Sequence, residues 1–357
     1  MSSLTETIST PVTKMFGIKY PIMLAGMNVA AGPELAAAVT NHGGLGVIGG
    51  VGYTPKLLQK TIDELKSFLN DKNAPFGVDL LLPKVGEGAR KTNYDYTGGA
   101  LNELVDIIIK NGAKLFVSAV GVPPKEVVDK LHAAGIPVMN MVGAPKHAQY
   151  AIEAGVDLIC AQGGEGGGHT GDVATSILIP KVVDICRGHM SPLTGEPILV
   201  IAAGGIFDGR GLAMSLSLGA SAVWVGTRFV ASVEAGAPPR HKKGVVAAGF
   251  NDTRRTTIYS GRPMRCIKTS YIDDWEDNKQ QQIKELTAEG TIPAFWDMET
   301  RKERGLPEAN IMDVQPMLCG AAAAAITEIL PAAVIMDEMI SGAIMALRSA
   351  TSAISKL

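Results

Sequence analysis

Short runs of consecutive apolar residues alternate with amphipathic segments along the first two thirds of this chain of 357 residues, and this alternation constrains the fold more than any other feature. The runs are continuous instead of alternating with polar residues, which is typical of parallel strands buried on both faces. Eight strands are therefore expected, at residues 22–25, 45–48, 76–80, 115–120, 138–142, 158–161, 198–202 and 222–225.

Helical periodicity fills the intervals between these runs. Segment 55–69 shows it most clearly, because its apolar residues repeat at the spacing of one helix face. Helices are expected at 33–40, 55–69, 101–110, 124–134, 145–154, 177–187 and 209–218. Strand followed by helix, repeated eight times, predicts an α/β fold of the (β/α)8 TIM-barrel type, with a doubly wound open sheet as the alternative.

The pattern changes after the eighth run. Residues 237–244 are rich in proline and lysine, and residues 273–289 are strongly polar. Three regions are predicted: a barrel core at 1–235, an inserted lid-like region at 236–320 that covers the barrel mouth, and a closing helix at 321–357. The last barrel helix is expected at the start of the segment that begins at Arg228.

Composition argues against several classes of partner. The net charge is −2 and aromatic residues are 5% of the chain, so neither nucleic acid nor an anionic membrane surface is expected to bind. No apolar run reaches the roughly 18 residues that a bilayer-spanning helix needs. The cysteines show no metal-ligand spacing, so no metal site is expected; they are Cys160, Cys186, Cys266 and Cys319.

The chain ends in Ser355, Lys356 and Leu357. A terminal S-K-L is a peroxisomal address read by an import receptor, so peroxisomal import is predicted if the source is eukaryotic, and a cytoplasmic location otherwise. The alanine-rich closing helix could pack on the barrel or on a second subunit, which leaves a homodimer open.

A glycine-rich stretch, AQGGEGGGHTGD at residues 161–172, follows the sixth apolar run. Glycine lets the backbone approach a ligand closely, and a helix N-terminus after the loop would suit an anion. His169 is the natural proton-transfer group there, because histidine titrates near neutral pH. Glu165 is expected to face solvent, and Asp172 to cap the following helix.

Two further glycine-rich turns follow the seventh and eighth runs. They are AAGGI at 202–206 and GTRF at 226–229, with DGRG at 208–211 opening the helix between them. The carboxyl ends of barrel strands carry the active site, and this pair of turns is where such barrels bind phosphate. A phosphate cradle is therefore predicted at these turns.

Several motifs together resemble the nitronate monooxygenase family, formerly called 2-nitropropane dioxygenases. They are PIMLAGM at 21–27, PFGVDL at 75–80, AQGGEGGGH at 161–169, IAAGGI at 201–206, DGRG at 208–211, VGTRF at 225–229 and SGRPMR at 260–265. The similarity extends over residues 12–266. It implies a TIM barrel that depends on FMN, with flavin quinone reductases and enoyl reductases as close kin.

The resemblance also implies roles for individual residues. His169 corresponds to the family's catalytic base. The implied FMN contacts are Ala25, Gly26, Met27, Asp79, Gln162, Gly167, Gly168, Gly204, Gly205, Trp224, Val225, Gly226 and Thr227. Asp79 departs from the family, which commonly has Asn there; an ionised Asp can only accept hydrogen bonds.

Three functions follow as hypotheses. The first is FMN-dependent oxidation of alkyl nitronates by O2 to a carbonyl compound and nitrite, with His169 taking the acidic proton beside the nitro group. The second is NAD(P)H-dependent reduction of quinones or enoyl thioesters, although no dinucleotide-binding G-x-G-x-x-G follows a strand. The third is a non-catalytic flavin-binding barrel.

Overall fold

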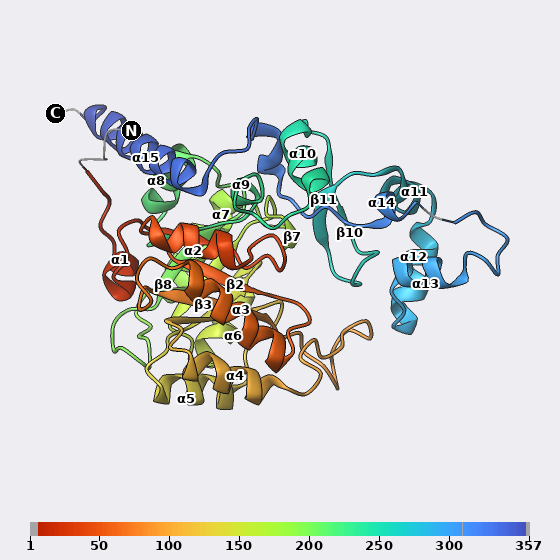
Figure 1. The fold of residues 1–357 in the computed structure, drawn as a ribbon, viewed down its shortest axis with the longest axis horizontal. Helices are drawn as coiled ribbons and strands as arrows, with labels where there is room; N and C mark the ends of the chain where they lie inside the picture. Colours follow the sequence, from red (N-terminus) through yellow and green to blue (C-terminus); the bar gives the residue numbers. More distant parts are fainter. Residues whose placement is uncertain (1–5, 309, 355–357) are drawn as a thin grey trace.

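A computed structural model describes residues 6–308 and 310–354 and shows a closed barrel of parallel strands (Figure 1). The strand order is β1-β9-β8-β6-β5-β4-β3-β2, and a parallel bridge between Met23 and Leu45 brings the two ends of this order together. The strands are β1 (Ile22–Leu24), β2 (Gly46–Gly50), β3 (Phe76–Leu81), β4 (Leu115–Ala119), β5 (Val138–Val142), β6 (Leu158–Gln162), β8 (Leu199–Ala203) and β9 (Ala222–Val225). The barrel prediction is confirmed, and the open sheet is excluded.

Helices surround the barrel in the predicted order. They are α2 (Pro33–Asn41), α3 (Pro55–Phe68), α4 (Leu101–Lys110), α5 (Lys125–Ala133), α6 (Pro145–Glu153), α7 (Thr175–Cys186) and α8 (Gly209–Ser217), preceded by α1 (Pro11–Phe16). Several start with proline in the first turn, where its missing N–H costs no hydrogen bond. Side chains that point inward from the strands, such as Met23, Val117 and Ile201, form a core inside the barrel.

The eighth barrel helix comes from the end of the chain. The segment after β9 forms only the short α9 (Thr227–Val230), whereas α15 (Ala332–Ser352) packs against α8 and α2 and completes the ring (Figure 1). The expected helix at 321–357 is also divided, because Ala321–Ala325 forms a 3-10 turn, η1, and α15 begins only after Pro331.

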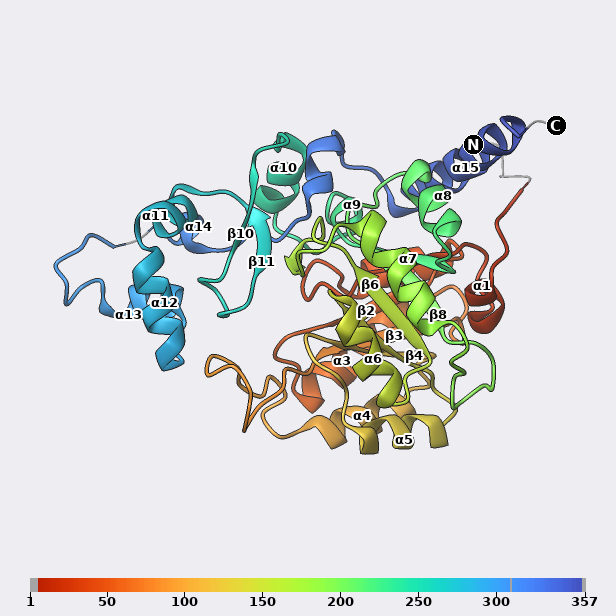
Figure 2. The same cartoon turned by 180° about the vertical axis from the view of Figure 1, so that it is seen from behind.

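The region between α9 and η1 builds a second, smaller structure. Its elements are α10 (Pro239–Ala247), β10 (Thr253–Thr256), β11 (Met264–Ile267), α11 (Ser270–Asn278), α12 (Gln280–Glu289), α13 (Pro293–Thr300) and α14 (Ile311–Val314). It has its own apolar cluster around the fully buried Trp275. Strand β11 pairs with β7 (Gly168–His169) of the glycine-rich loop, and α11–α14 extend outward on the side of the barrel where the strands have their carboxyl ends (Figures 1 and 2).

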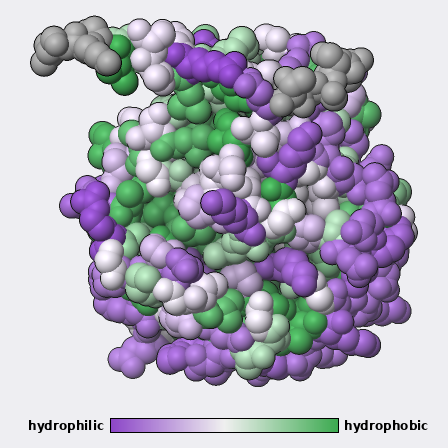
Figure 3. Space-filling model, turned by 90° about the vertical axis from the view of Figure 1, so that its left-hand side faces the viewer, coloured by the Kyte–Doolittle hydropathy of each residue, from purple (hydrophilic) through white to green (hydrophobic). Residues whose placement is uncertain are grey.

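The surface carries scattered apolar residues. Figure 3 shows one face, on which hydrophobic patches are separated by hydrophilic side chains. On α15, Met345 is 65% exposed, so an apolar side chain on this helix remains open to solvent. Across residues 6–308 and 310–354, no helix has both the length and the hydropathy to cross a membrane. Ser355, Lys356 and Leu357 lie outside the described residues, and peroxisomal import stays a prediction.

Candidate active site

The carboxyl ends of β1 and β9 lie against each other at the barrel mouth. The backbone N–H of Ala25 donates to the carbonyl of Val225 at 3.0 Å. A Cβ on Gly226 would lie 3.3 Å from Sδ of Met27. The structure therefore brings together the segments 25–27 and 225–227, which were predicted to contact the cofactor from opposite ends of the barrel sequence.

The turn after β8 presents free backbone donors next to this pair. Gly204 and Gly205 have φ values of 92° and 74°, a conformation that side-chain-bearing residues avoid. In the described part of the chain, the N–H groups of Gly204, Gly205 and Gly226 donate to no protein acceptor. Half-buried amides without partners suit an anion such as phosphate.

Side chains from neighbouring segments hold the glycine-rich loop over the mouth. The amide nitrogen of Gln162 donates to the carbonyl of His169 at 2.8 Å. The hydroxyl of Thr175 donates to the carbonyl of Gly204 at 2.9 Å and so joins the start of α7 to the turn after β8. Gln162 therefore helps to hold the loop in place, and its side-chain oxygen Oε1 accepts no hydrogen bond from the described residues.

Glu165 caps helix α7, contrary to the expectation that it faces solvent. Its carboxylate accepts a hydrogen bond from the backbone N–H of Thr175 at 2.9 Å and lies 2.7 Å from the Thr175 hydroxyl, whose one hydrogen it shares with the carbonyl of Gly204. An acidic group is favourable at this positive end of a helix. The predicted cap, Asp172, instead pairs with Arg255 at the surface. The carboxylate of Glu165 thus occupies the N-terminus of α7, so the anion-binding cradle consists of the turns after β8 and β9.

His169 is a neutral histidine held in a defined position. Its Nε2 lies 2.8 Å from Oγ of Ser260, and Nδ1 forms no hydrogen bond with the described residues. Burial, with a smaller contribution from the positive charge of Arg262, lowers the pKa of His169 to about 4. The expected titration near neutral pH is therefore wrong for this environment, and the imidazole is unprotonated at pH 7.

Ser260 and Arg262 belong to a part of the site to which the sequence assigned no role. They lie in the SGRPMR motif, just before β11, whose pairing with β7 fixes the backbone of His169. The guanidinium of Arg262 donates to the side chain of Asn93 and to the carbonyl of Val120, both in loops at the carboxyl ends of barrel strands. The inserted region thus supplies both the partner of His169 and a nearby positive charge.

Asp79 lies inside the barrel wall. It is 2% exposed on β3, in register with Gly49 and Val117 on the flanking strands. Its Oδ1 is buried without a hydrogen-bond partner, and its Oδ2 lies 2.5 Å from where a Cβ on Gly26 would be. Desolvation raises the pKa of Asp79 to about 8, so the group is mainly a neutral acid at pH 7.

The remaining predicted contacts differ in what they offer. The side chain of Trp224 is buried in the inner barrel core, and that of Val225 in the outer core. Gly167 lies against the backbone of Cys319, because a Cβ on it would be 2.5 Å from that carbonyl carbon. Gly320 in turn donates its N–H to Oγ1 of Thr227. Apart from Gly320 itself, no sequence pattern predicts that residues 319–320 reach the site.

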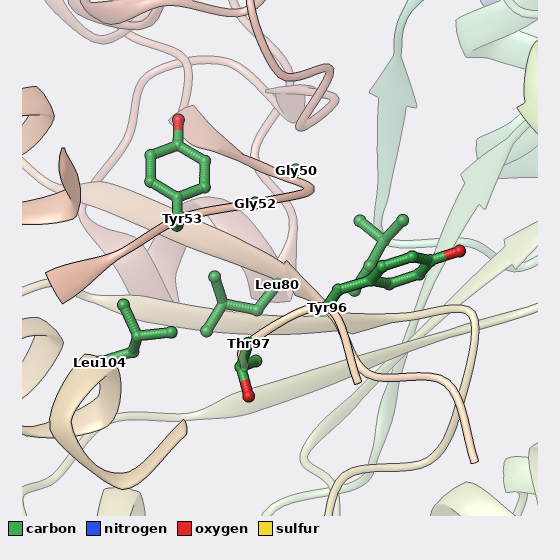
Figure 4. Close-up of a pocket in the computed structure, with 8 residues that line it drawn as sticks. Gly50, Gly52, Tyr53, Leu80, Tyr96, Thr97 and Leu104 are labelled. Atoms are coloured by element: carbon green, nitrogen blue, oxygen red, sulfur yellow. The ribbon is translucent and has the colours of Figure 1, made fainter. Parts of the chain in front are cut away.

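A narrow hollow without room for a water molecule lies beside the ends of β2 and β3 (Figure 4). Its lining includes Tyr53, Leu80, Tyr96, Thr97 and Leu104. Side chains alternate along a strand, so Leu80 faces the helices while its neighbour Asp79 faces the barrel interior. The hollow therefore lies outside the barrel wall, separate from the mouth where His169 is placed.

The fold and the site define a class of protein: a barrel enzyme with a neutral base and an anion-binding cradle at the carboxyl ends of its strands. A model described as nitronate monooxygenase matches residues 9–342, so the chain belongs to the nitronate monooxygenase family. It is an oxidoreductase. The hypothesis of a non-catalytic barrel is thereby excluded.

The similar proteins are named for different reactions. A (3aS,4S,5R,7aS)-5-hydroxy-7a-methyl-1-oxo-octahydro-1H-indene-4-carboxyl-CoA dehydrogenase of Mycobacterium tuberculosis is 36% identical over 76% of this chain and 70% of its own. A probable nitronate monooxygenase of Staphylococcus saprophyticus is 31% identical over 74% and 80%. The structure of FabK from Thermotoga maritima superposes with a TM-score of 0.76 at 32% identity, covering 98% of this chain and 100% of FabK.

Proposed function

We propose that this chain binds FMN at the barrel mouth and oxidises alkyl nitronates with O2 to a carbonyl compound and nitrite. The observation that carries the proposal is His169, a neutral imidazole oriented by Ser260, with Nδ1 unengaged. A base of this kind can take the acidic proton next to a nitro group. The motif resemblance and the 31% identical staphylococcal relative support the same reaction.

The residues at the mouth fit FMN. The free N–H groups of Gly204, Gly205 and Gly226 would hold the phosphate, as backbone donors commonly do in barrels. Asp79, with an unpartnered buried oxygen, would contact a polar edge of the ring. When bound, FMN supplies the redox chemistry by accepting electrons from the substrate and passing them to O2.

The chain's own residues supply proton transfer and charge. His169 removes the proton from carbon and then carries a positive charge beside the resulting anion. Arg262 adds a second positive charge close enough to lower the pKa of His169. At pH 7 the positive charge that would attract a preformed nitronate is that of Arg262, because His169 is neutral there. Once His169 has taken the proton of a neutral nitroalkane, both groups would stabilise the resulting anion.

An acyl-thioester oxidoreductase is the second candidate. The 36% identical mycobacterial relative is named as a carboxyl-CoA dehydrogenase. Arg90 and Arg262 lie together at the mouth, and their hydrogen bonds go to neutral carbonyl and amide oxygens, not to carboxylates. Cations without acidic partners suit a substrate that carries phosphate groups. The NAD(P)H-dependent reduction of enoyl thioesters or quinones belongs to this alternative.

Nitrite release and O2 uptake test the proposal, with nitroethane and propyl-2-nitronate as substrates. His169→Asn should slow the nitroethane reaction by about 10²–10⁴-fold, the usual contribution of a general base, and slow the nitronate reaction less. His189→Asn, an exposed histidine at the other end of the barrel, is the matched control and should retain full activity. A wild-type protein that is inert with both nitro compounds but oxidises or reduces an acyl-CoA would establish the second candidate instead.

A further inference from the structure

Asp79 is a carboxyl group in the barrel interior whose proton has no role in the proposed reaction. Its side chain is 2% exposed and is enclosed among inward-facing apolar residues of the barrel. No salt bridge joins it to a cation anywhere in residues 6–308 and 310–354, and Oδ1 has no donor. An ionised, unpaired carboxylate in such surroundings would be costly.

The groups that face Asp79 cannot offset a negative charge. The flanking strands β2 and β4 contribute no titratable side chain. From β1 the chain presents Gly26, whose lack of a Cβ makes room for Oδ2. The titratable groups in electrostatic contact are Tyr53 and Cys160, and both would add negative charge if they ionised.

A neutral carboxyl group removes this conflict and offers both a hydrogen-bond donor and an acceptor. Protonated Asp has one O–H donor and one carbonyl acceptor, which matches the donor and acceptor of an amide. The raised pKa agrees with the geometry. The expectation that Asp79 can only accept hydrogen bonds therefore does not hold at pH 7.

We propose that Asp79 is a proton-carrying positioning residue that donates a hydrogen bond from its neutral carboxyl group to the bound cofactor, so that its ionisation weakens cofactor binding. The proposal rests on FMN being the occupant of the mouth. An amide in this position could not show this behaviour, because an amide does not titrate. Loss of cofactor affinity at alkaline pH becomes a property of this single side chain.

FMN affinity measured against pH tests the proposal. Quenching of flavin fluorescence gives the Kd of the apoprotein between about pH 6 and pH 10, and linkage predicts a wild-type Kd that rises about tenfold per pH unit once Asp79 ionises. Asp79→Asn should bind FMN with a Kd that lacks this rise. Ionisation of the flavin ring occurs in both proteins and cancels in the comparison. Tyr53→Phe and Cys160→Ala are controls for the neighbouring groups and should behave as wild type.

The outcomes separate the two proposals. An equal rise of Kd in wild type and Asp79→Asn would overturn the role of Asp79 while leaving FMN binding intact. Absence of FMN binding by the wild type at every pH would overturn the proposed function itself. Infrared spectroscopy gives a readout that does not depend on the variant's affinity: the wild type at pH 7 should show a protonated-carboxyl C=O band that disappears at alkaline pH. A carboxylate signal from Asp79 at pH 7 would refute the inference.

Discussion

Replacing Ser260 by Ala removes the partner of His169 without touching the imidazole. The hydroxyl is 2.8 Å from Nε2 and belongs to a residue that is 8% exposed, so water cannot readily take its place. The net value of such a hydrogen bond is about 0.5–1.5 kcal/mol, which corresponds to roughly a two- to twelvefold loss if it is spent on holding the ring for proton transfer. Complete removal of the base should cost far more, about 10²-fold or above.

Steady-state O2 uptake with nitroethane measures this loss. Ser260→Ala should lower kcat/KM by the smaller factor with unchanged flavin content, and Ser260→Thr, which keeps the hydroxyl, should recover most of it. The acid limb of the pH profile should stay where it is, because burial and Arg262, not Ser260, depress the pKa of His169. Full activity of Ser260→Ala, or a loss as large as that of His169→Asn, would refute the assignment of Ser260 as a positioning residue.

Three other predictions follow from the same geometry. The acid limb of the kcat/KM profile should have its midpoint near pH 4. Arg262→Gln should move this midpoint to higher pH, because a positive charge beside His169 is lost, and an unchanged midpoint would contradict this. The pKa of His169 is about 4 in the folded protein and 6.5 in the unfolded chain, so the unfolded chain binds the proton first as the pH falls. The contribution of this group to the free energy of unfolding should therefore decrease as pH falls from 6.5 to 4. Urea titrations of His169→Asn should lack this decrease. Gly167→Ala should lower the free energy of unfolding by about 1–3 kcal/mol, because its Cβ would meet the Cys319 backbone, whereas Gly32→Ala has room and should change it little; equal effects would argue against the 319–320 contact.

The barrel could be predicted from the sequence because its signal is local. Most strands are largely apolar runs, several of them followed by a glycine-rich turn, and the helices have their own periodicity, so the predicted boundaries lie within a few residues of the observed ones. Strand β7 could not be found this way. Gly168 and His169 have little intrinsic preference for a strand, and they adopt that conformation because β11, almost one hundred residues later, pairs with them.

The missed parts of the site depend on contacts between distant segments. The alanine run at 321–325 has high helix propensity, yet it forms a 3-10 turn where Ala321 donates its N–H to the carbonyl of Glu165. Glu165 caps α7 across ten residues, a spacing that no local capping pattern contains. The low pKa of His169 depends on burial and on Arg262, neither of which is visible from the loop sequence.

The central claim is that a flavin at the barrel mouth receives electrons from a nitronate under the control of His169. An absorbance spectrum of the purified protein, recorded without oxygen before and after propyl-2-nitronate, NADPH and NADH are added separately, tests it most directly. The account predicts flavin bands that change with the nitronate and not with either nicotinamide. Bleaching by NADPH or NADH alone would contradict the nitronate reaction, and a protein that neither carries nor takes up flavin would contradict the proposed site.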